Sequence, residues 1–314
     1  MTFSVICPVY NEIEFITQFF DFIESAKIKP IELFVIDGMS TDGTRYYLEN
    51  KCKKLSYLQI LNNSNRTVPF ALNLAIPLCT GEIIIRLDAH TKYAIDYFDK
   101  ILETFDKVDA DIVGGPTRTI SKNSKQEAIA YMFNTSFGMG NSSIHDIKFK
   151  GYTDSVTFGA WKRDIFRKSG LFDTQLKRNQ DDEFHYRAIT MGYKIYQNPE
   201  IQLFYYPRSS FNGLFKQYFE YGLYKPMVLK KIKTAFKFRH LAPSFFVSYL
   251  IILIFFYWLI GNILLLPLFI YILLDFYFVL KSKKSYFVKF CILISYPTVH
   301  LGYGLGFILG LFKK

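Results

Sequence analysis

The chain has few of the residues that build redox and metal-cluster motifs. Its four cysteines are spread over 314 residues and form no CxxC pair. Isolated cysteines in apolar segments, such as Cys7 and Cys79, are typical of small buried side chains in a reducing compartment. The N-terminus also lacks the charged and then apolar pattern of a secretory leader. Both absences predict that the water-soluble part stays in the cytoplasm with reduced thiols.

Glycine is missing where a dinucleotide-binding fold would need it. The segment CPVYNEIE at residues 7–14 contains no glycine, and no GxxxxGK[ST] sequence occurs anywhere in the chain. A Rossmann turn needs glycines so that a pyrophosphate can approach the N-terminus of the next helix. The sequence therefore disfavours an NAD or FAD site and lacks a Walker nucleotide site.

Acidic residues are almost absent from the last third of the chain. After Glu220 there are twelve lysines and arginines but one acid, Asp275, so this tail carries the whole formal charge of +11. Within residues 241–280 Asp275 is also the single charge, and we assign it no function. As helix these residues would reach about 60 Å, twice the roughly 30 Å of a bilayer's hydrocarbon core. We expect two spans that turn at Gly261 and Asn262.

Basic segments flank this apolar hairpin. Residues 209–240 include KPMVLKKIKTAFKFRH, which predicts an amphipathic helix at the bilayer surface, although a solvated basic helix fits the same pattern. This segment and the KSKK sequence then share the cytoplasmic side, as the positive-inside rule requires. A third apolar segment covers about 288–312. If it spans, Lys313 and Lys314 emerge outside against that rule, so a re-entrant or interfacial course stays open.

Short apolar runs alternate with amphipathic stretches of helix length in the first part of the chain. This alternation predicts an α/β fold, a mostly parallel sheet with helices on both faces. Ligands bind such sheets outside the carboxyl ends of the strands, where the CPVYNE turn, Asp37 and Asp88 are expected to meet. The expected strands are residues 3–9, 31–36, 57–61, 83–87 and 110–114, with helices near 15–26 and 93–108.

The run IIIRLDAH at residues 83–90 ends a buried strand in Asp88 and His90. A carboxylate and an imidazole one residue apart can hold one divalent cation. Taken alone, the same pair also fits a turn cap and a surface histidine. Because imidazole is a softer ligand than a second carboxylate, Mn²⁺ suits the pair at least as well as Mg²⁺.

Four segments in chain order carry a family resemblance: CPVYNE, VIDGMSTDGT, RLDAH and RNQDDEFHYR. Their order resembles the inverting, family-two nucleotide-sugar glycosyltransferases of the GT-A fold. It is similar in particular to the bacterial succinoglycan and exopolysaccharide type, which carries D-A-H in place of D-x-D. The resemblance covers residue 3 to about 230 and, less specifically, the apolar tail.

The resemblance assigns a nucleotide pocket to the strand ends. It implies that Asp37 takes the edge of the base, commonly uracil, so that a UDP-sugar is the favoured donor. Arg66 matches a segment beside the nucleotide, where a guanidinium suits a diphosphate. Asp42 fits a helix N-cap equally well, and Arg86 fits a structural partner of a nearby acid. The implied nucleotide-binding residues are Pro8, Tyr10, Glu12, Asp37, Arg66 and Asp88, and the implied metal ligands are Asp88 and His90.

The catalytic base is expected at the acidic start of a late helix. Inverting transfer needs a group that takes the proton of the attacking hydroxyl. By resemblance this is the aspartate of a Glu-Asp pair, which here reads Gln180 and Asp181, with the glutamate replaced. We expect Asp181 in this role and Asp182 as the second candidate. An acidic helix start that complements the macrodipole is the structural alternative.

Acceptor-side residues are also implied by the resemblance. Trp161 is a candidate platform for sugar stacking, although a core position suits it as well. Lys216 and Gln217 lie in FKQYFEYG, which resembles a short basic and aromatic motif of the family. The Q-x-x-R-W signature of processive synthases is missing, so addition of a single sugar is favoured.

Together these observations predict a membrane-anchored, metal-dependent inverting glycosyltransferase. We expect a GT-A domain at residues 1–208, an interfacial segment at 209–240 and membrane helices at 241–314. The acceptor would be a lipid-linked (polyprenyl diphosphate) saccharide at the cytoplasmic face of the inner membrane, and no nucleic-acid partner is expected. A sugar nucleotidyltransferase and a catalytically degenerate membrane scaffold are the alternatives.

Overall fold

The computed structural model describes residues 1–140 and 142–313. The chain forms two compact units. The first contains Met1–Arg118 and Ser143–Tyr205, and the second contains Thr119–Ser142 and Tyr206–Lys314. Residues 119–142 thus interrupt the first unit in sequence but pack within the second. The predicted boundary at residue 208 is based on composition. Composition does not indicate that residues 119–142 pack in the second unit.

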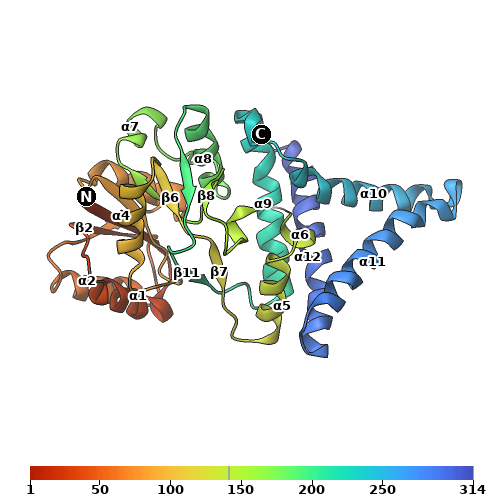
Figure 1. Ribbon diagram of the computed structural model, residues 1–314, viewed down its shortest axis with the longest axis horizontal. Helices are drawn as coiled ribbons and strands as arrows, with labels where there is room; N and C mark the ends of the chain where they lie inside the picture. The colour runs from red at the N-terminus through yellow and green to blue at the C-terminus, as the bar shows by residue number, and fades with distance from the viewer. Residues whose placement is uncertain (141, 314) are drawn as a thin grey trace. The chain divides into compact units, whose positions relative to one another are not determined.

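The first unit is built on an eight-stranded sheet with the order β3-β2-β1-β4-β9-β6-β10-β8 (Figure 1). Strands β3, β2, β1 and β4 are mutually parallel, whereas β9 runs antiparallel to both β4 and β6. A second, three-stranded sheet has the order β5-β11-β7. The strands are β1 (Phe3–Val9), β2 (Glu32–Asp37), β3 (Leu58–Asn62), β4 (Ile83–Arg86), β5 (Lys92–Tyr93), β6 (Ile112–Gly114), β7 (Thr117–Thr119), β8 (Gly151–Tyr152), β9 (Ala160–Lys162), β10 (Ile195–Gln197) and β11 (Leu203–Tyr205).

Helices cover both faces of the large sheet because its buried strands are apolar on both sides. In β4, Ile83 and Ile85 face one core and Ile84 faces the other, as the two-residue period of a strand requires. Helices α1 (Ile13–Ser25) and α4 (Tyr97–Lys107) pack into the first core, with Leu48 of α2 (Thr44–Cys52). Helices α3 (Val68–Ala75), α7 (Ile165–Ser169) and α8 (Gln180–Thr190) pack into the second. The predicted α/β architecture is confirmed, and the five expected strands are present to within two residues at each end.

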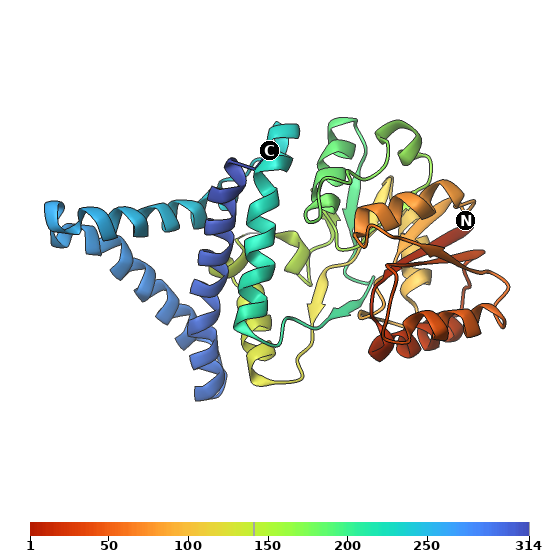
Figure 2. The ribbon, with the colours of Figure 1, turned by 180° about the vertical axis from the view of Figure 1, so that it is seen from behind.

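The second unit is helical. It contains α5 (Ser124–Phe133), α6 (Ser136–Met139), α9 (Phe211–Lys231), α10 (Phe238–Ile260), α11 (Leu266–Lys281) and α12 (Tyr286–Leu311). The chain turns between α10 and α11 at Gly261, as expected from the sequence. The φ of this glycine is +81°. Figures 1 and 2 both show α9 and α12 side by side within this unit.

Helices α9 and α12 approach each other closely enough to exclude side chains. A Cβ added at Gly306 of α12 would lie 2.1 Å from the carbonyl oxygen of Phe219 on α9. A Cβ at Gly222 of α9 would lie 2.1 Å from the carbonyl oxygen of Tyr303. Glycines at the contact let the two helix backbones touch, which is typical of helix pairs in membranes. The two helices run in the same direction, since Lys230 at the end of α9 donates to the carbonyl of Leu311 at the end of α12 (3.2 Å).

The segment at residues 119–142 is fixed to the C-terminal helices by hydrogen bonds. The hydroxyl of Tyr131 donates to the carbonyl of Phe278 on α11 (2.9 Å). The hydroxyls of Thr135 and Tyr296 lie 3.0 Å apart. Phe137 packs against the rings of Tyr296 and other α11 and α12 side chains. This segment therefore belongs to the helical unit by specific contacts.

Three described helices are long and apolar enough to cross a bilayer, by length and composition: residues 238–260, 262–281 and 286–311. They differ in what surrounds them. The most apolar stretch is 11% buried in each of the first two helices and 50% buried in the third. Most residues of this stretch thus face outward in the first two helices, whereas half of the residues of the α12 stretch are buried against protein.

Candidate functional site

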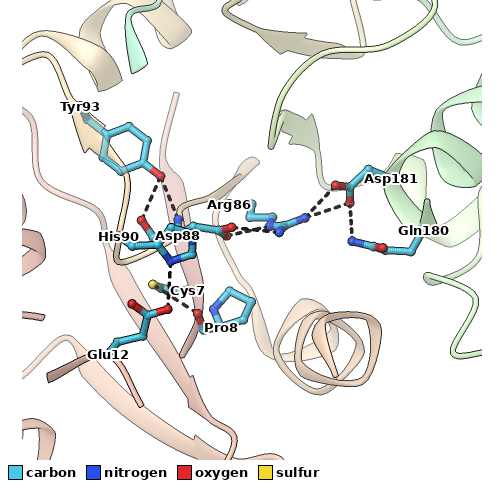
Figure 3. A network of polar contacts seen from close by, with 9 residues as sticks. All are labelled: Cys7, Pro8, Glu12, Arg86, Asp88, His90, Tyr93, Gln180 and Asp181. Atoms are coloured by element: carbon cyan, nitrogen blue, oxygen red, sulfur yellow. Dashed lines mark hydrogen bonds and ion pairs between the residues drawn. The ribbon is translucent and has the colours of Figure 1, made fainter. Parts of the chain in front are cut away.

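A buried guanidinium links the two carboxylates that the sequence assigns to different steps. Arg86 lies at the end of β4, with 5% of its side chain exposed. Its Nε donates to Oδ1 of Asp88 (3.1 Å), and its Nη2 donates to Oδ2 of the same residue (3.3 Å). Its Nη1 donates to both oxygens of Asp181, at 2.9 and 3.0 Å (Figure 3). Asp88 and Asp181 are thereby held on opposite sides of one planar group.

The charges at this centre explain why the guanidinium tolerates burial. Burial alone would lower the pKa of Arg86, but the carboxylates of Asp181 and Asp88 outweigh it and raise that pKa above its usual value. The ring of Phe158 lies 5.3 Å from the guanidinium carbon and covers one face. Arg86 is therefore a permanent cation, and the two carboxylates remain paired with it.

Hydrogen bonds from the strand end fix the backbone of Asp88. The Asp88 N–H donates to the hydroxyl oxygen of Tyr93 (2.8 Å), and that hydroxyl lies 3.3 Å from the Asp88 carbonyl (Figure 3). Burial, together with the nearby Tyr97 and Asp88, raises the pKa of Tyr93. Its phenol therefore stays protonated and clamps the turn that carries the D-A-H sequence.

His90 is oriented by a second acid. Its Nδ1 lies 2.9 Å from Oε1 of Glu12, which comes from the turn after β1 (Figure 3). A carboxylate at one ring nitrogen fixes the imidazole's tautomer and directs the other nitrogen, Nε2, to a metal. The predicted Asp88 and His90 pair thus lies in the loop after β4, with its histidine held as a metal ligand would be.

The side-chain atoms of this pair suit a divalent cation that is also coordinated by water or by a bound substrate. Among the described residues there is no group of three or more His, Cys, Asp or Glu side chains that could hold a metal ion together. Asp88 and His90 offer one carboxylate and one imidazole, which suit Mn²⁺ and Mg²⁺. A cation here would take its remaining ligands from water or from substrate phosphates, as Mg²⁺ commonly does.

The strand-end loops that would surround a nucleotide are tied to each other. Asn11 accepts a hydrogen bond from the Thr41 N–H (2.8 Å), and its own N–H donates to Ser40 (2.9 Å). Asp37 is buried and accepts from the hydroxyl of Ser40 (2.6 Å). Arg45 lies 3.7 Å from the same carboxylate. The implied base-binding acid is thus oriented by its own loop.

Tyr10 and Arg66 form the exposed part of this edge. The Arg66 guanidinium carbon lies 5.5 Å from the Tyr10 ring centroid, and Tyr10 is 44% exposed. Arg66 has a φ of +56°, a left-handed backbone that a non-glycine residue adopts at some cost. Pro8 lies within β1 beside Ile36 of β2, one residue before the strand ends. The implied nucleotide residues Pro8, Tyr10, Glu12, Asp37, Arg66 and Asp88 all come from the first unit.

Asp42 serves the loops in the way a cap would. It accepts from the N–H (3.0 Å) and hydroxyl (2.6 Å) of Thr44 at the start of α2, and from the N–H of Ile13 at the start of α1 (3.0 Å). Burial alone would raise the pKa of Asp42, but these hydrogen bonds lower it. Its contacts favour the capping alternative.

The start of α8 presents the proposed base. Asn179, just before the helix, has a φ of +61°, so the chain turns sharply into Asp181 and Asp182. The side-chain amide of Gln180 donates to Oδ1 of Asp181 (3.3 Å). Glu183 is occupied elsewhere, since it pairs with Arg187 through two hydrogen bonds of 2.8 and 2.9 Å. Within the acidic run, Asp181 contacts the Arg86 centre.

Trp161 is placed differently from the stacking platform that the family resemblance implies. It is fully buried, and its ring lies 5.7 to 6.3 Å from those of Phe166, Phe172 and Phe184. A ring without an exposed face cannot stack on a sugar, so the structure favours its alternative role in the core. The other two acceptor candidates, Lys216 and Gln217, belong to α9 of the second unit, where Gln217 donates to the hydroxyl of Tyr221 (3.0 Å).

Comparison with known proteins identifies the family. The family model for glycosyl transferase family 2 matches residues 4–170, which contain β1 to β9 and the Arg86, Asp88 and His90 centre. The chain belongs to glycosyl transferase family 2. This glycosyltransferase is 30% identical over 238 residues to a protein of Methanococcus voltae, covering 73% of this chain and 74% of the relative. That relative is named dolichyl N-acetyl-alpha-D-glucosaminyl phosphate 3-beta-D-2,3-diacetamido-2,3-dideoxy-beta-D-glucuronosyltransferase.

Two further similarities bear on the predicted type and fold. The glycosyltransferase is 29% identical over 222 residues to the succinoglycan biosynthesis protein ExoA of Rhizobium meliloti (strain 1021), covering 69% of this chain and 67% of that protein. The mannosyltransferase PcManGT of Pyrobaculum calidifontis, solved with GDP-Man and Mn²⁺, superposes with a TM-score of 0.68 at 18% identity. The match covers 99% of this chain and 87% of that one. The predicted family, exopolysaccharide type and GT-A fold are confirmed.

Two contributors to the centre had a weak signal in the sequence. Arg86 was expected at most to pair with a nearby acid, and its link to Asp181 spans 95 positions. Tyr93 carries no motif at all, because its role depends on a turn that brings its hydroxyl back to Asp88. A buried arginine inside an apolar strand was the one available sign, since such a cation must find carboxylate partners.

We expect Arg86→Lys to weaken both the fold and sugar transfer, because a lysine ammonium cannot donate to two separated carboxylates in one plane. The loss should amount to about 1–3 kcal/mol, or several degrees in melting temperature for a unit of this size. The turnover number should fall roughly ten-fold or more. Thermal unfolding and initial rates of the purified protein measure both effects.

The matched control is Arg163→Lys. Arg163 lies in the same unit but donates to the carbonyl of Thr80 (2.6 Å), outside the centre. Wild-type turnover in Arg86→Lys, or equal losses in both variants, would show that the two-carboxylate grip is dispensable.

Proposed function

We propose that this glycosyltransferase is a metal-dependent inverting enzyme that adds one sugar to a lipid-linked (polyprenyl diphosphate) saccharide. The donor is a nucleotide sugar, with a UDP-sugar favoured, and the reaction takes place at the cytoplasmic face of the inner membrane. The observation that carries the proposal is the Arg86 centre. It places a carboxylate of the D-A-H sequence and the carboxylate of Asp181 on opposite sides of one guanidinium.

Asp181 is suited to act as the base. In an inverting transfer the acceptor hydroxyl attacks the anomeric carbon while the bond from that carbon to the diphosphate oxygen breaks, and the hydroxyl proton passes to the base. Both Asp181 oxygens contact the same nitrogen of Arg86, so each keeps lone pairs directed elsewhere. Arg86 thus orients Asp181 without using its whole capacity to accept a proton. Asp182 is the second candidate.

The D-A-H sequence is suited to hold the cation. When bound, a divalent cation there would neutralise the charge that develops on the departing diphosphate. Asp88 supplies a carboxylate and His90 an imidazole, and Glu12 orients the latter. The Mn²⁺ in the Pyrobaculum mannosyltransferase supports use of a divalent cation in this fold. In this chain the preference for Mn²⁺ over Mg²⁺ is part of the proposal.

The loops after β1 and β2 are suited to the nucleotide. Asp37 can accept from the base, and Arg66 and Tyr10 form an exposed cationic and aromatic edge for the nucleotide. GDP-Man in the Pyrobaculum enzyme shows that this fold accepts a purine nucleotide as well. The choice of uracil therefore rests on the family resemblance of Asp37.

A lipid-linked acceptor is supported by the apolar helices and by a relative. The Methanococcus relative's name describes a dolichyl-linked substrate. Lys216 and Gln217 of α9, which lie within the basic segment at residues 209–240, stay as proposed acceptor contacts. Confinement of enzyme and acceptor to one bilayer raises the acceptor's effective concentration. The functional division into residues 1–208, 209–240 and 241–314 stays a proposal, with residues 119–142 packed in the helical unit.

The course of α12 favours a cytoplasmic C-terminus. Because α9 and α12 run in the same direction, the end of α12 lies beside Lys230, and the Lys313 ammonium lies 3.7 Å from the ring centroid of Tyr224 on α9. Helix α9 carries several charged side chains and is suited to the membrane surface. We propose that α10 and α11 cross the bilayer and that α12 follows α9 along the interface. Lys313 then satisfies the positive-inside rule.

Asp181→Asn should abolish transfer while leaving the donor site intact. Amide nitrogen cannot accept the hydroxyl proton, so we expect the turnover number to fall about 10²-fold or more. Asp182→Asn is the matched control on the same helix turn and should retain most activity.

Nuclear magnetic resonance of the product tests inversion at the anomeric carbon. A retained configuration would contradict inversion, and an equal loss of activity in both variants would contradict Asp181 as the base. Pyrophosphate release from a nucleoside triphosphate would instead indicate a nucleotidyltransferase.

Chelation with EDTA should stop transfer, and added Mn²⁺ should restore it.

Glu12→Gln should weaken Mn²⁺ binding about 10- to 100-fold, because the carboxylate that orients His90 is lost. His90→Asp should shift the preference toward Mg²⁺, a harder cation. Electron paramagnetic resonance of free Mn²⁺ reports binding separately from activity. Glu14→Gln, at an exposed position on α1, is the control. Equal affinities in all variants would place the cation elsewhere.

A cysteine at residue 312 should be protected from membrane-impermeant maleimide added outside intact cells. Phe312 is 80% exposed, so a cysteine there is accessible on whichever side it lies. Asn262→Cys, at the turn between α10 and α11, should label from outside in the same background without native cysteines. Labelling of Phe312→Cys from outside would mean that α12 crosses the bilayer.

A further inference from the structure

A cavity of about 470 Å³ lies within the second unit. Its walls come from α6 and the residues after it, the first turns of α10, and the facing sides of α9, α11 and α12. Most of the lining is apolar or aromatic, and includes Phe137, Met139, Phe246 and Val299. The volume is in the range of small-molecule binding sites. The Arg86 centre and the strand-end loops of the first unit contribute no residue to this lining.

Two basic side chains of the cavity come from the start of α10. Arg239 and His240 lie in the first turn of α10 and line the cavity. Ser136 of α6 and Ser142 also contribute to the lining. The stem of Arg239 packs on Gly140, where an added Cβ would lie 3.3 Å from Cβ and Cδ of the arginine. This contact holds a cation at the edge of an otherwise apolar space.

The wall formed by α11 and α12 has polar groups, Tyr271 and His300, that are hydrogen-bonded within the protein. The ring nitrogens of His300 lie 2.8 Å from the hydroxyl of Tyr271 and 2.9 Å from the carbonyl of Phe137. These groups bond to each other across three elements, so they ask no hydrogen bond of a ligand. That wall therefore offers a ligand aromatic and apolar surface.

The sequence position of Arg239 sets its depth. Helix α10 begins at Phe238 and is apolar enough to cross a bilayer, so its first turn lies at the level of the lipid headgroups. A ligand with an anionic head and a hydrocarbon chain matches this arrangement, with its charge at Arg239 and its chain between the helices. A space of about 470 Å³ with aromatic side chains in its walls suits one unsaturated chain better than the two acyl chains of a bilayer phospholipid.

We propose that this cavity binds the phosphate end and first isoprene units of a polyprenyl diphosphate. The inference rests on the proposed function, because it names the part of the chain that holds the lipid of the acceptor. Arg239 neutralises the phosphate, and the aromatic walls bind the chain. The sugar attached to the diphosphate stays outside the cavity.

The test uses the full chain in nanodiscs and a polyprenyl diphosphate that carries a photoreactive diazirine in its first isoprene units. Peptide mass spectrometry should find the label on residues of α6, α10 or α12 that line the cavity. Unlabelled polyprenyl diphosphate should compete about ten-fold better than polyprenol, which lacks the phosphates. Label found elsewhere, or equal competition by phosphatidylglycerol, would overturn the proposal.

Variants separate the phosphate from the chain. Arg239→Gln should reduce labelling about ten-fold and make the diphosphate compete no better than polyprenol. Ala242→Trp, at an exposed lining position, should block labelling by filling the space. The control Lys233→Gln removes a cation from an exposed position of the same basic segment outside the cavity and should label as the wild type does. Equal losses in Lys233→Gln and Arg239→Gln would show a general effect of charge and contradict the site.

A parallel measurement keeps this proposal distinct from the proposed function. Mn²⁺-dependent binding of UDP by the first unit should be unchanged in Arg239→Gln and Ala242→Trp. UDP binding without cavity labelling would overturn the lipid site and leave the transferase mechanism standing. Cavity labelling without turnover of any nucleotide sugar would confirm the lipid site and overturn the proposed transfer.

Discussion

The fork of Arg86 holds two carboxylates that the chain supplies 95 positions apart. Taking such charges out of water is costly, and the cost is met only when each charge has well-placed partners. Here Arg86 is nearly buried, while Asp88 and Asp181 keep 16% and 30% of their side chains exposed. The cation thus lies inside, and both carboxylates face the edge of the sheet. This constraint forces the end of β4 and the start of α8 to lie against each other, and those two ends carry the proposed cation ligand and the proposed base.

The aromatic core beneath α8 supports the same geometry from the other side. Trp161 on β9 packs against Phe172 and Phe184, and Phe184 lies three residues after Asp181 on α8. Because β9 pairs with β4, the tryptophan fixes the helix relative to the strand that carries Arg86. A residue first considered for stacking on a sugar therefore has an indirect part in the site. It sets the position of the helix that bears Asp181, whereas the proposed substrate contacts come from residues at the sheet edge.

Local pattern predicted what depends on neighbours in sequence, and it could not predict what depends on distant partners. The strands follow from runs of β-branched residues, and the D-A-H sequence and its strand end could be read together because they are contiguous. Helix α10, helix α11 and their turn at Gly261 follow from apolar length in the same way. The ordinary composition of residues 119–142 predicts that they belong to the sheet domain, whereas their partners Phe278 and Tyr296 come more than 140 positions later. Trp161 had two compatible roles, and three-dimensional burial alone distinguishes them.

The close contact of α9 and α12 connects the charge pattern of the tail to the proposed acceptor. Glycines let the two backbones touch, and the shared direction of the helices brings the end of α12 to the basic end of α9. A helix bound along its length to an amphipathic neighbour gains little by leaving it to cross a bilayer alone, since its buried half would exchange protein contacts for lipid contacts of similar strength. The basic residues of α9 and Lys313 can then lie on one side of the membrane, as the proposed topology requires. The proposed soluble donor and lipid-bound acceptor can react only if both are reached from that side, so the glycine contact and the charge distribution serve the same requirement.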